Sequence, residues 1–440
     1  MNLSRLFAAH LFWRGAYLLS SIVVTVLMAR YLQAATTGWV FYFISWLSLA
    51  LLIAMAGMDA AATYFVASGH IAADRMEVFA LLWTGICTLM GSIIAAFFAP
   101  GNSGIFSSHA TLAFALFFLS GNMLITFMNA LFYARRDFVT PNIVFTATNA
   151  ALGIWLWGGV RGTELTLVGF SFLEIYFFSF LFQGVLVWTL YRLQQPRLRF
   201  QNLMPLHDVK KLLLYSGWAF GANVLFFIVT RVDYWLIEAF VPDAEGLGNY
   251  IQASRLVQLF QMVPGVLAAA VFPLTAGGWG QQLQLRVATL SRVIISGYAV
   301  VLLLLIAFGQ YLFPLVFGPS FRSMYAYFIL LVPGLLALTA LSLISAYLAA
   351  INRVRFNMWG AATAAGVITI AGILFIPGYG IEAAAIISSI GYMLCFGVGA
   401  YFFGRHTGVA WWHFFIWQKG DGAFLKQVLN QLKAGAAKKT

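Results

Sequence analysis

The chain has few charged residues for its length, and this scarcity decides its class. Of 440 residues, 9% are charged, with 25 Lys and Arg against 13 Asp and Glu, whereas 62% are apolar. A soluble domain carries roughly 25% charged residues, which it needs to cover its exterior with groups that water solvates. So few charges exclude a soluble protein of this size. The solvent around most of its surface must be lipid.

Alternating polar and apolar segments are also missing. A strand of a transmembrane β-barrel shows about ten residues of alternating character, whereas the apolar runs here are long and continuous. A membrane-spanning helix needs about 20 apolar residues to cross the hydrocarbon. The sequence therefore predicts an all-α polytopic membrane protein with about twelve transmembrane helices. The first run, about 11–31, lacks a small-residue cleavage site and is interpreted as a retained span.

The common motifs of enzymatic and metal chemistry do not occur. The two cysteines, Cys87 and Cys395, both lie within apolar runs, so they imply no disulfide framework. The six histidines are scattered without metal-ligand spacing. The sequence contains no GxxxxGK(S/T) phosphate loop and no GxSxG nucleophile elbow in a suitable context. We therefore expect no catalytic residues, no metal site, no cofactor and no enzymatic activity.

The apolar runs divide the chain into two halves of six spans. We predict six-helix lobes at 1–190 and 212–403, a basic cytoplasmic linker at 191–211, and a cytoplasmic interfacial tail at 404–440. The predicted spans are about 11–31, 39–66, 78–98, 110–133, 142–160, 165–190, 212–240, 249–274, 289–316, 324–350, 357–376 and 382–403. The tail begins with aromatic residues typical of an interfacial anchor. After Gly422 it is either a short helix on the membrane or an irregular segment.

A weak internal repeat supports two related halves. The segment 29–32 precedes Gly38 as the segment 239–242 precedes Gly248, and each copy lies between the first and second span of its half. With six spans in each half, both halves have the same orientation about an axis along the membrane normal.

The basic residues of the loops predict the orientation. With the N-terminus in the cytoplasm, the opposite side holds only Arg30, Arg161 and Arg322 of the 25 basic residues, and Arg231 and Arg255 lie within spans. Cytoplasmic loops carry an excess of Lys and Arg, so both termini are predicted to be cytoplasmic. The net charge of +12 is then explained by loops that face anionic membrane lipids, without any nucleic-acid partner.

Ionisable residues within spans cost about 2.5–3.5 kcal/mol each on insertion scales and are candidates for function. Glu174 lies about nine residues into the predicted span 165–190, which is roughly 14 Å deep at the helical rise. Its sequence neighbours offer no opposite charge. We interpret it as an ion-coupling carboxyl, the alternative being a protonated group that hydrogen bonds to a neighbouring helix.

Arg255 lies about six residues into the predicted span 249–274, and Gln252 and Gln258 lie three residues away on either side. The three side chains share a helical face. Because a guanidinium binds phosphate bidentately and keeps its charge, this polar stripe is a candidate substrate site. The alternative is that Arg255 pairs with an acid on another span.

Arg231 and Asp233 lie in the outer third of the predicted span 212–240. Residues two apart point to nearly opposite faces of a helix, so each needs a partner on another element. Arg231 is a candidate substrate contact and Asp233 a candidate ion-coupling group. The alternative is that both belong to an anchor cluster at the outer headgroups.

Two further candidates lie near the predicted inner surface. Asp59 follows Gly57-Met58 in the inner third of the second span, where it either lines the inner mouth of a cavity and contributes to ion coupling or marks the end of the span. Arg14 lies within about one turn of the inner end of the first span. It either binds substrate or extends to the interface while its stem stays in the hydrocarbon.

Two sets of motifs carry a resemblance to a known family. They are Arg231-Val232-Asp233-Tyr234-Trp235-Leu236-Ile237 followed by Gly248-Asn249-Tyr250-Ile251-Gln252-Ala253 and Phe272-Pro273, and Ala29-Arg30-Tyr31-Leu32 with Gly38 before Gly57-Met58-Asp59. Over roughly 1–400, the motifs and the layout of spans resemble the polysaccharide-flippase branch of the multidrug/oligosaccharidyl-lipid/polysaccharide (MOP) exporter superfamily. The resemblance implies two six-helix lobes around a central cavity that opens alternately to each side of a bacterial inner membrane.

The resemblance also implies a substrate and its contacts. O-antigen-type members pass undecaprenyl-diphosphate-linked oligosaccharides from the cytoplasmic to the outer leaflet. In the related lipid II flippases, arginines on the first and eighth spans face the cavity and meet the lipid diphosphate, and the matching positions here are Arg14 and Arg255. Those relatives have two further spans, for which this chain has no room. The second span here departs from them because its only charged residue is Asp59.

The leading hypothesis is therefore a multi-pass flippase of polysaccharide biosynthesis that moves a lipid-linked oligosaccharide and is coupled to H⁺ or Na⁺. A second hypothesis is a multidrug exporter of the same superfamily. A cationic drug requires acids in the cavity, whereas the first span carries Arg14 and Arg30 and no acid. A third is a non-transporting membrane scaffold with a degenerate flippase fold.

Overall fold

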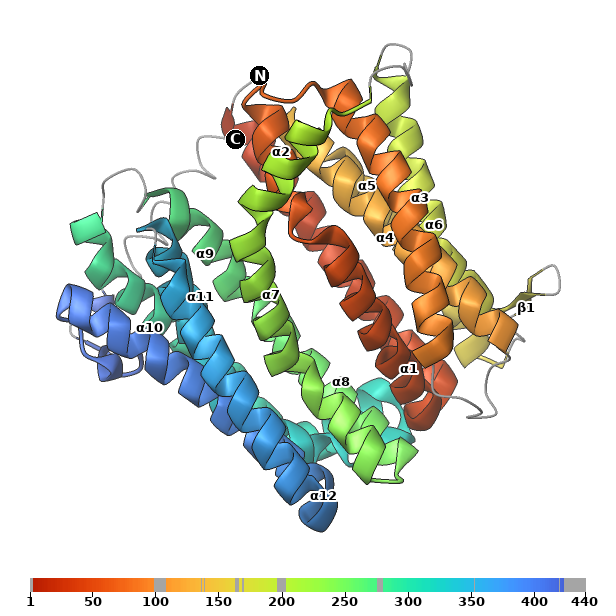
Figure 1. The fold of residues 1–440 in the computed structure, drawn as a ribbon. Coiled ribbons are helices and arrows are strands. Elements are labelled where there is room, and N and C mark those ends of the chain that lie inside the picture. The colour runs from red at the N-terminus through yellow and green to blue at the C-terminus, as the bar shows by residue number, and fades with distance from the viewer. Residues whose placement is uncertain are drawn as a thin grey trace, which may run out of the picture. The chain divides into compact units, whose positions relative to one another are not determined.

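The structure is a computed structural model, and its helices fill almost the whole described chain (Figure 1). It describes residues 3–98, 108–135, 137, 139–162, 166–167, 170–195, 203–274, 280–351, 353–418 and 420–422. The predicted all-α class is confirmed, and the only strands in this part of the chain form a short antiparallel pair.

The chain divides into two compact units. The N-terminal unit comprises Met1–Gln33 and Trp39–Val224, and the C-terminal unit comprises Ala34–Gly38 and Leu225–Thr440. The elements up to residue 193 are α1 (Leu3–Met55), α2 (Met58–Ala67), α3 (Ala73–Phe98), α4 (Ser108–Ala134), α5 (Thr140–Val160), β1 (Thr166–Leu167), β2 (Phe170–Ser171) and α6 (Phe172–Leu193). The later elements are α7 (Leu206–Phe240), α8 (Ala244–Phe260), α9 (Met262–Leu274), α10 (Gly280–Phe317), η2 (Pro319–Phe321), α11 (Met324–Ala350), α12 (Val354–Thr407) and η3 (Trp411–Phe414).

Two helices are long enough to cross a membrane twice. Among the described residues, nine helices have the length and apolar composition of membrane spans. Of these, α1 has 53 residues and α12 has 54, which is about 80 Å of helix against about 30 Å of hydrocarbon. Each is interrupted by a non-helical residue, Gln33 in α1 and Gly380 in α12. Each therefore supplies two crossings, in agreement with the first and last pairs of predicted spans.

Two other predicted spans are each divided into two helices. In the second span, Ala56 and Gly57 have positive φ angles and separate α1 from α2. In the eighth, Gln261 separates α8 from α9. Pro264 lies in the first turn of α9 and has no N–H to continue the hydrogen bonds of α8, which accounts for the break. Apolar composition alone does not reveal either interruption.

The predicted linker 191–211 is shorter in the structure. Helix α6 continues to Leu193 and α7 begins at Leu206, while residues 196–202 lie outside the described residues. Tyr191 is buried with 1% of its side chain exposed, because it packs in the core of the N-terminal unit rather than in a loop. The segment after Gly422, for which both a short helix and an irregular segment were expected alternatives, also lies outside the described residues.

The two glycines of the internal repeat lie against each other within the C-terminal unit. A Cβ added to Gly38 would lie 2.4 Å from the Cα of Gly248, and one added to Gly248 would lie 2.0 Å from the carbonyl oxygen of Ala34. Neither position has room for a side chain, since real Cβ contacts are never so short. The repeated glycine thus permits a close approach between α1 beyond Gln33 and the first turns of α8.

A buried ion pair holds the segment after α12 against α10. The Nε and Nη2 atoms of Arg292 donate to Asp421 at 2.6 and 2.7 Å, and its Nη1 donates to the carbonyl of His413. The two side chains are only 4% and 3% exposed. The Arg292 hydrogen bonds lower the pKa of Asp421 below its usual value. This contact places η3 and its tryptophans beside the end of α12.

We expect Arg292→Ala to release residues 409–415 from α10. Removing one partner of a buried pair leaves an uncompensated charge and costs about 3–5 kcal/mol, so amide hydrogen exchange in this segment should accelerate. Arg322→Ala, which removes an exposed arginine, is the matched control. In the unaltered protein the pair stabilises the segment fully above the ordinary carboxyl pKa of about 3.9 and is lost as the pH falls through the lower, folded-state pKa. Unchanged exchange in Arg292→Ala would contradict this role.

Candidate functional site

A network of polar side chains connects three helices inside the C-terminal unit. Tyr250, Ser254 and Gln258 recur every fourth residue of α8, so they share one face of that helix. Helix α7 contributes Arg231, Asp233 and Tyr234, and α12 contributes Ser388. We call these seven residues the C-unit polar network. Polar groups so placed in apolar helices are costly unless each finds a hydrogen-bond partner.

Asp233 is the acid of this network and is 1% exposed. Its carboxylate accepts hydrogen bonds from the Tyr250 hydroxyl, from Ser388 Oγ at 2.9 Å and from the backbone N–H of Tyr234 at 2.9 Å. Within the described chain it forms no ion pair. All three donors are neutral groups, and Arg231, the cation of this network, donates its hydrogen bonds to Tyr234 and Gln258 instead. Burying a charged carboxyl in an apolar bundle is costly. A proton or a small cation would relieve that cost.

Arg231 is held by a separate part of the same network. Its Nη1 donates to the Tyr234 hydroxyl at 2.8 Å and its Nη2 donates to Gln258 Oε1 at 2.9 Å. The Tyr234 hydroxyl in turn donates to Ser254 Oγ at 2.8 Å. The prediction that Arg231 and Asp233 each need a partner on another element is confirmed. The Asp233 carboxyl is buried among α7, α8 and α12, and the alternative of an anchor cluster at the outer headgroups stays a prediction.

The predicted stripe on α8 is only partly joined to this network. Gln258 bonds to Arg231 and, at 3.5 Å, to Ser254. Gln252 is 3% exposed, and its Oε1 accepts no hydrogen bond from the described residues. Arg255 is half-buried. A substrate contact by Gln252, Arg255 or Gln258 stays a prediction.

Arg14 is exposed near the beginning of the first candidate span, which starts at Phe12. Its guanidinium carbon lies 5.5 Å from the centroid of the Tyr17 ring, and that ring packs 5.3 Å from Phe145. Among the described residues Arg14 forms no ion pair with an acid. The guanidinium is thus supported by an aromatic ring and open to an anion. Asp59 is the second residue of α2, and its side chain lies outside the described residues.

The predicted position of Glu174 in the middle of a span is wrong. Helix α6 begins at Phe172, so Glu174 lies in its first turn, where its Oε2 accepts from the backbone N–H of Ser171 at 2.6 Å and from Ser171 Oγ at 2.9 Å. Thr166–Leu167 and Phe170–Ser171, which the prediction assigned to the span, form β1 and β2 instead. Glu174 is a capping residue on the edge of a largely apolar cavity of about 870 Å³ between α4, α5 and α6.

We expect Glu174→Gln to leave both folding and transport unchanged. Glutamine also serves as the third residue of a capping box, whereas Glu174→Ala removes the acceptor and should cost about 1 kcal/mol of stability. Thermal unfolding of the purified variants measures the difference, and a transport assay accompanies it. Loss of transport in a well-folded Glu174→Gln variant would show that the charge itself is needed and would contradict the capping role.

Some buried polar residues of the C-unit polar network and of the N-terminal unit were not among the predicted site residues. Tyr250 and Ser254 share the helical spacing of Gln258, a signal that ionisable groups and the amides beside Arg255 do not reveal by themselves. Glu77 in α3 is 1% exposed and accepts from Trp188 Nε1 at 2.9 Å and from Arg192 Nη1 at 3.1 Å. Because it lies only four residues after the start of α3, it was not counted within the predicted span 78–98.

Comparison with protein-family models now identifies the chain. Residues 10–279 match the family described as polysaccharide biosynthesis protein. The chain belongs to this family. No curated protein matches it.

Solved structures share the fold of this polysaccharide biosynthesis family member. An inward-facing multidrug resistance MATE transporter of the MOP superfamily has a TM-score of 0.65 at 15% identity, covering 89% of this chain and 94% of the other. The lipid II flippase MurJ in an inward closed conformation has a TM-score of 0.58 at 14% identity, covering 90% and 86%. A MOP superfamily transporter from Pyrococcus furiosus has a TM-score of 0.60 at 14% identity, covering 92% and 95%.

The family and the fold together confirm several predictions. The chain belongs to a polysaccharide biosynthesis family, its described part contains nine helices that are long and apolar enough to cross a membrane, and it shares its fold with solved transporters of the MOP superfamily and with the lipid II flippase MurJ. At these identities the solved structures establish the fold alone. The orientation with both termini in the cytoplasm stays a prediction.

Proposed function

We propose that the protein flips a prenyl-diphosphate-linked oligosaccharide, a polysaccharide repeat unit, from the cytoplasmic to the outer leaflet by alternating access. The observation that carries the proposal is the match of residues 10–279 to a polysaccharide biosynthesis family in a chain with a transporter fold. The polysaccharide itself is hydrophilic, so its lipid-linked precursor needs a protected path through the membrane.

The physical requirement is to move a diphosphate and its sugars through hydrocarbon. Charged groups are costly there unless they are paired or hydrated. A hydrated cavity with fixed cations would pair the diphosphate, while the prenyl chain stays in lipid. The exposed guanidinium of Arg14 and the half-buried guanidinium of Arg255 have the fork geometry that phosphate oxygens accept. Gln252, Gln258 and Arg231 would add polar contacts for the headgroup.

Ion coupling is assigned to Asp233 in this proposal. This buried carboxyl accepts hydrogen bonds from three neutral donors and forms no ion pair in the described chain. Keeping it charged therefore costs free energy. Uptake of H⁺ or Na⁺ in one conformation and release in the other would tie the transport cycle to an ion gradient. Asp59 remains a second candidate, and Glu174 is no longer one because it caps α6.

A multidrug exporter is the second candidate, favoured by the likeness to MATE transporters. Against it stands the first span, whose only charged side chains are those of arginines, which repel cationic drugs. A deletion strain distinguishes the two functions. For a flippase we expect lipid-linked repeat units to accumulate on the cytoplasmic side while sensitivity to cationic dyes stays unchanged. Increased dye sensitivity without lipid-linked intermediates would contradict the flippase and support the exporter.

A further inference from the structure

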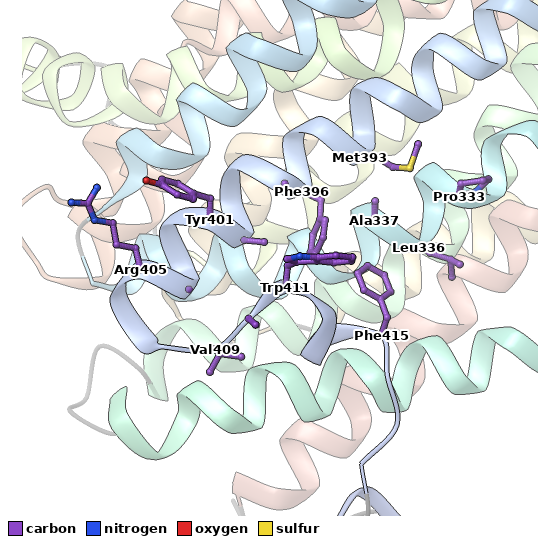
Figure 2. Close-up of a pocket in the computed structure, with 14 residues that line it drawn as sticks. Pro333, Leu336, Ala337, Met393, Phe396, Tyr401, Arg405, Val409, Trp411 and Phe415 are labelled. Carbon is purple, nitrogen blue, oxygen red and sulfur yellow. The ribbon is translucent and has the colours of Figure 1, made fainter.

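A groove runs along the end of α12 in the C-terminal unit, and none of its lining residues belongs to the C-unit polar network. Its volume is about 780 Å³, and it lies between α11, the last part of α12 and the segment 409–415 (Figure 2). Helix α11 packs along α12, and the Arg292–Asp421 pair holds the segment in place. Apolar side chains dominate the lining, among them Leu336, Ala337, Met393, Phe396, Trp411 and Phe415.

The length of the groove matches one leaflet of a bilayer. Met393 and Arg405 both line it and are twelve residues apart on α12, which corresponds to about 18 Å of helix. One leaflet contains about 15 Å of hydrocarbon, half of the bilayer core. A lipid acyl chain that lies parallel to α12 would therefore fill the groove from the headgroup level to the middle of the membrane.

One end of the groove is cationic. In Figure 2, Arg405 lies beyond Tyr401 at one end, and its guanidinium points away from the apolar side chains. Arg405 is exposed and makes no ion pair or hydrogen bond with a side chain that the structure describes. A second exposed cation, Arg355, neighbours Phe356, whose ring stacks at 3.9 Å on Phe402, one turn before Arg405. Exposed arginines at the end of a membrane-spanning helix are suited to pair with lipid phosphates, as juxtamembrane cations do.

We propose that this groove binds an anionic glycerophospholipid, with an acyl chain against Phe396 and Trp411 and the phosphate on Arg405. Trp411 and Trp412, which are 58% and 47% exposed, belong to the residue type that concentrates at the headgroup level. By the distribution of basic residues, this end of α12 is predicted to be cytoplasmic, where anionic lipids are enriched. The apolar groove and its cationic end together match an amphipathic lipid rather than a soluble ligand.

The test uses the full-length protein in liposomes that contain a photoreactive phosphatidylglycerol with a diazirine on its acyl chain. We expect label on peptides of residues 393–405 and 409–415. Gly397→Leu adds a side chain in the groove, where a Cβ would meet nothing within 4 Å, and it should abolish the label. Gly366→Leu is the matched control, since it is equally unobstructed and lies elsewhere on α12. Arg405→Gln should reduce the preference for phosphatidylglycerol over phosphatidylethanolamine by about fivefold.

Three results would overturn the proposal. Label that persists in Gly397→Leu would mean that the lipid lies outside the groove. Equal labelling by phosphatidylglycerol and phosphatidylethanolamine probes in the unaltered protein would mean that Arg405 does not select lipids by the charge of the headgroup. Displacement of the label by an equimolar polyprenyl diphosphate would assign the groove to the transport substrate. The inference does not depend on the flippase proposal. An Arg255 variant that no longer transports should still be labelled in the groove, so the two proposals can fail separately.

Discussion

We expect that replacing Arg255 with alanine abolishes flipping and that Arg255→Lys keeps part of the activity. The expected loss in the alanine variant is at least about 100-fold, because two hydrogen bonds to a charged phosphate contribute about 1.5–3 kcal/mol each and 1.36 kcal/mol corresponds to a factor of ten. Lysine keeps the positive charge but lacks the planar guanidinium fork, so the activity of Arg255→Lys should lie between that of Arg255→Ala and that of the unaltered protein. A complementation assay that scores surface polysaccharide measures the effect.

Stability has to be separated from transport in this experiment. Arg255 is half-buried on α8, and removing a cation from a helix interior can unfold a protein if an acid is left unpaired. Membrane abundance and thermal unfolding of each variant are therefore measured alongside. Arg322→Ala is the control for loss of one positive charge at an exposed position. Full complementation by an abundant Arg255→Ala variant would remove Arg255 from the substrate site.

Asp233→Asn should uncouple transport from the ion gradient. Asparagine has the shape of the carboxyl, and its one oxygen can still accept from the backbone N–H of Tyr234. Its NH₂ group replaces the other oxygen and can donate to the hydroxyls of Ser388 and Tyr250, which also act as acceptors, so the C-unit polar network should stay folded. It cannot release a proton or neutralise a cation. With one proton per cycle, each pH unit imposed across the membrane shifts the steady-state distribution of substrate about tenfold in the unaltered protein. The Asp233→Asn variant should show no such shift while its exchange without a gradient continues.

Proteoliposomes with an imposed proton or sodium gradient provide the measurement. Glu174→Gln is the matched acid-to-amide control, since its carboxylate caps α6, and it should keep the full response. A gradient response that persists in Asp233→Asn would place coupling elsewhere and direct the next test to Asp59.

The sequence predicted the class and the layout of spans well because these depend on composition and on the length of apolar runs. Breaks within long helices were harder to predict from the sequence. The positive φ at Gln33 occurs at an exposed residue whose type does not favour that region, so the sequence carries no local signal for this break. The pairing of Gly38 with Gly248 was visible only as a repeat, and the structure supplies its reason, the lack of room for a Cβ.

The candidate site was predicted in part. Buried ionisable residues on α7 and α8 could be selected because charges are rare in this sequence. Ser388 could not be linked to Asp233, because 155 residues separate them and no local spacing connects them. Glu174 was placed wrongly because hydropathy counts Thr166–Leu167 and Phe170–Ser171 as span, although they are strands. The pattern Ser171-x-x-Glu174 is a capping-box signature and could have located the start of α6.

Translocation by the purified protein in liposomes tests the central claim most directly. A prenyl-diphosphate-linked oligosaccharide is placed in the liposomes, and a membrane-impermeant glycosidase reports how much headgroup reaches the outer leaflet. The account predicts that the unaltered protein exposes the internal pool, that Arg255→Ala does not, and that a cationic dye is not transported. Dye transport with an inaccessible oligosaccharide pool would contradict the account.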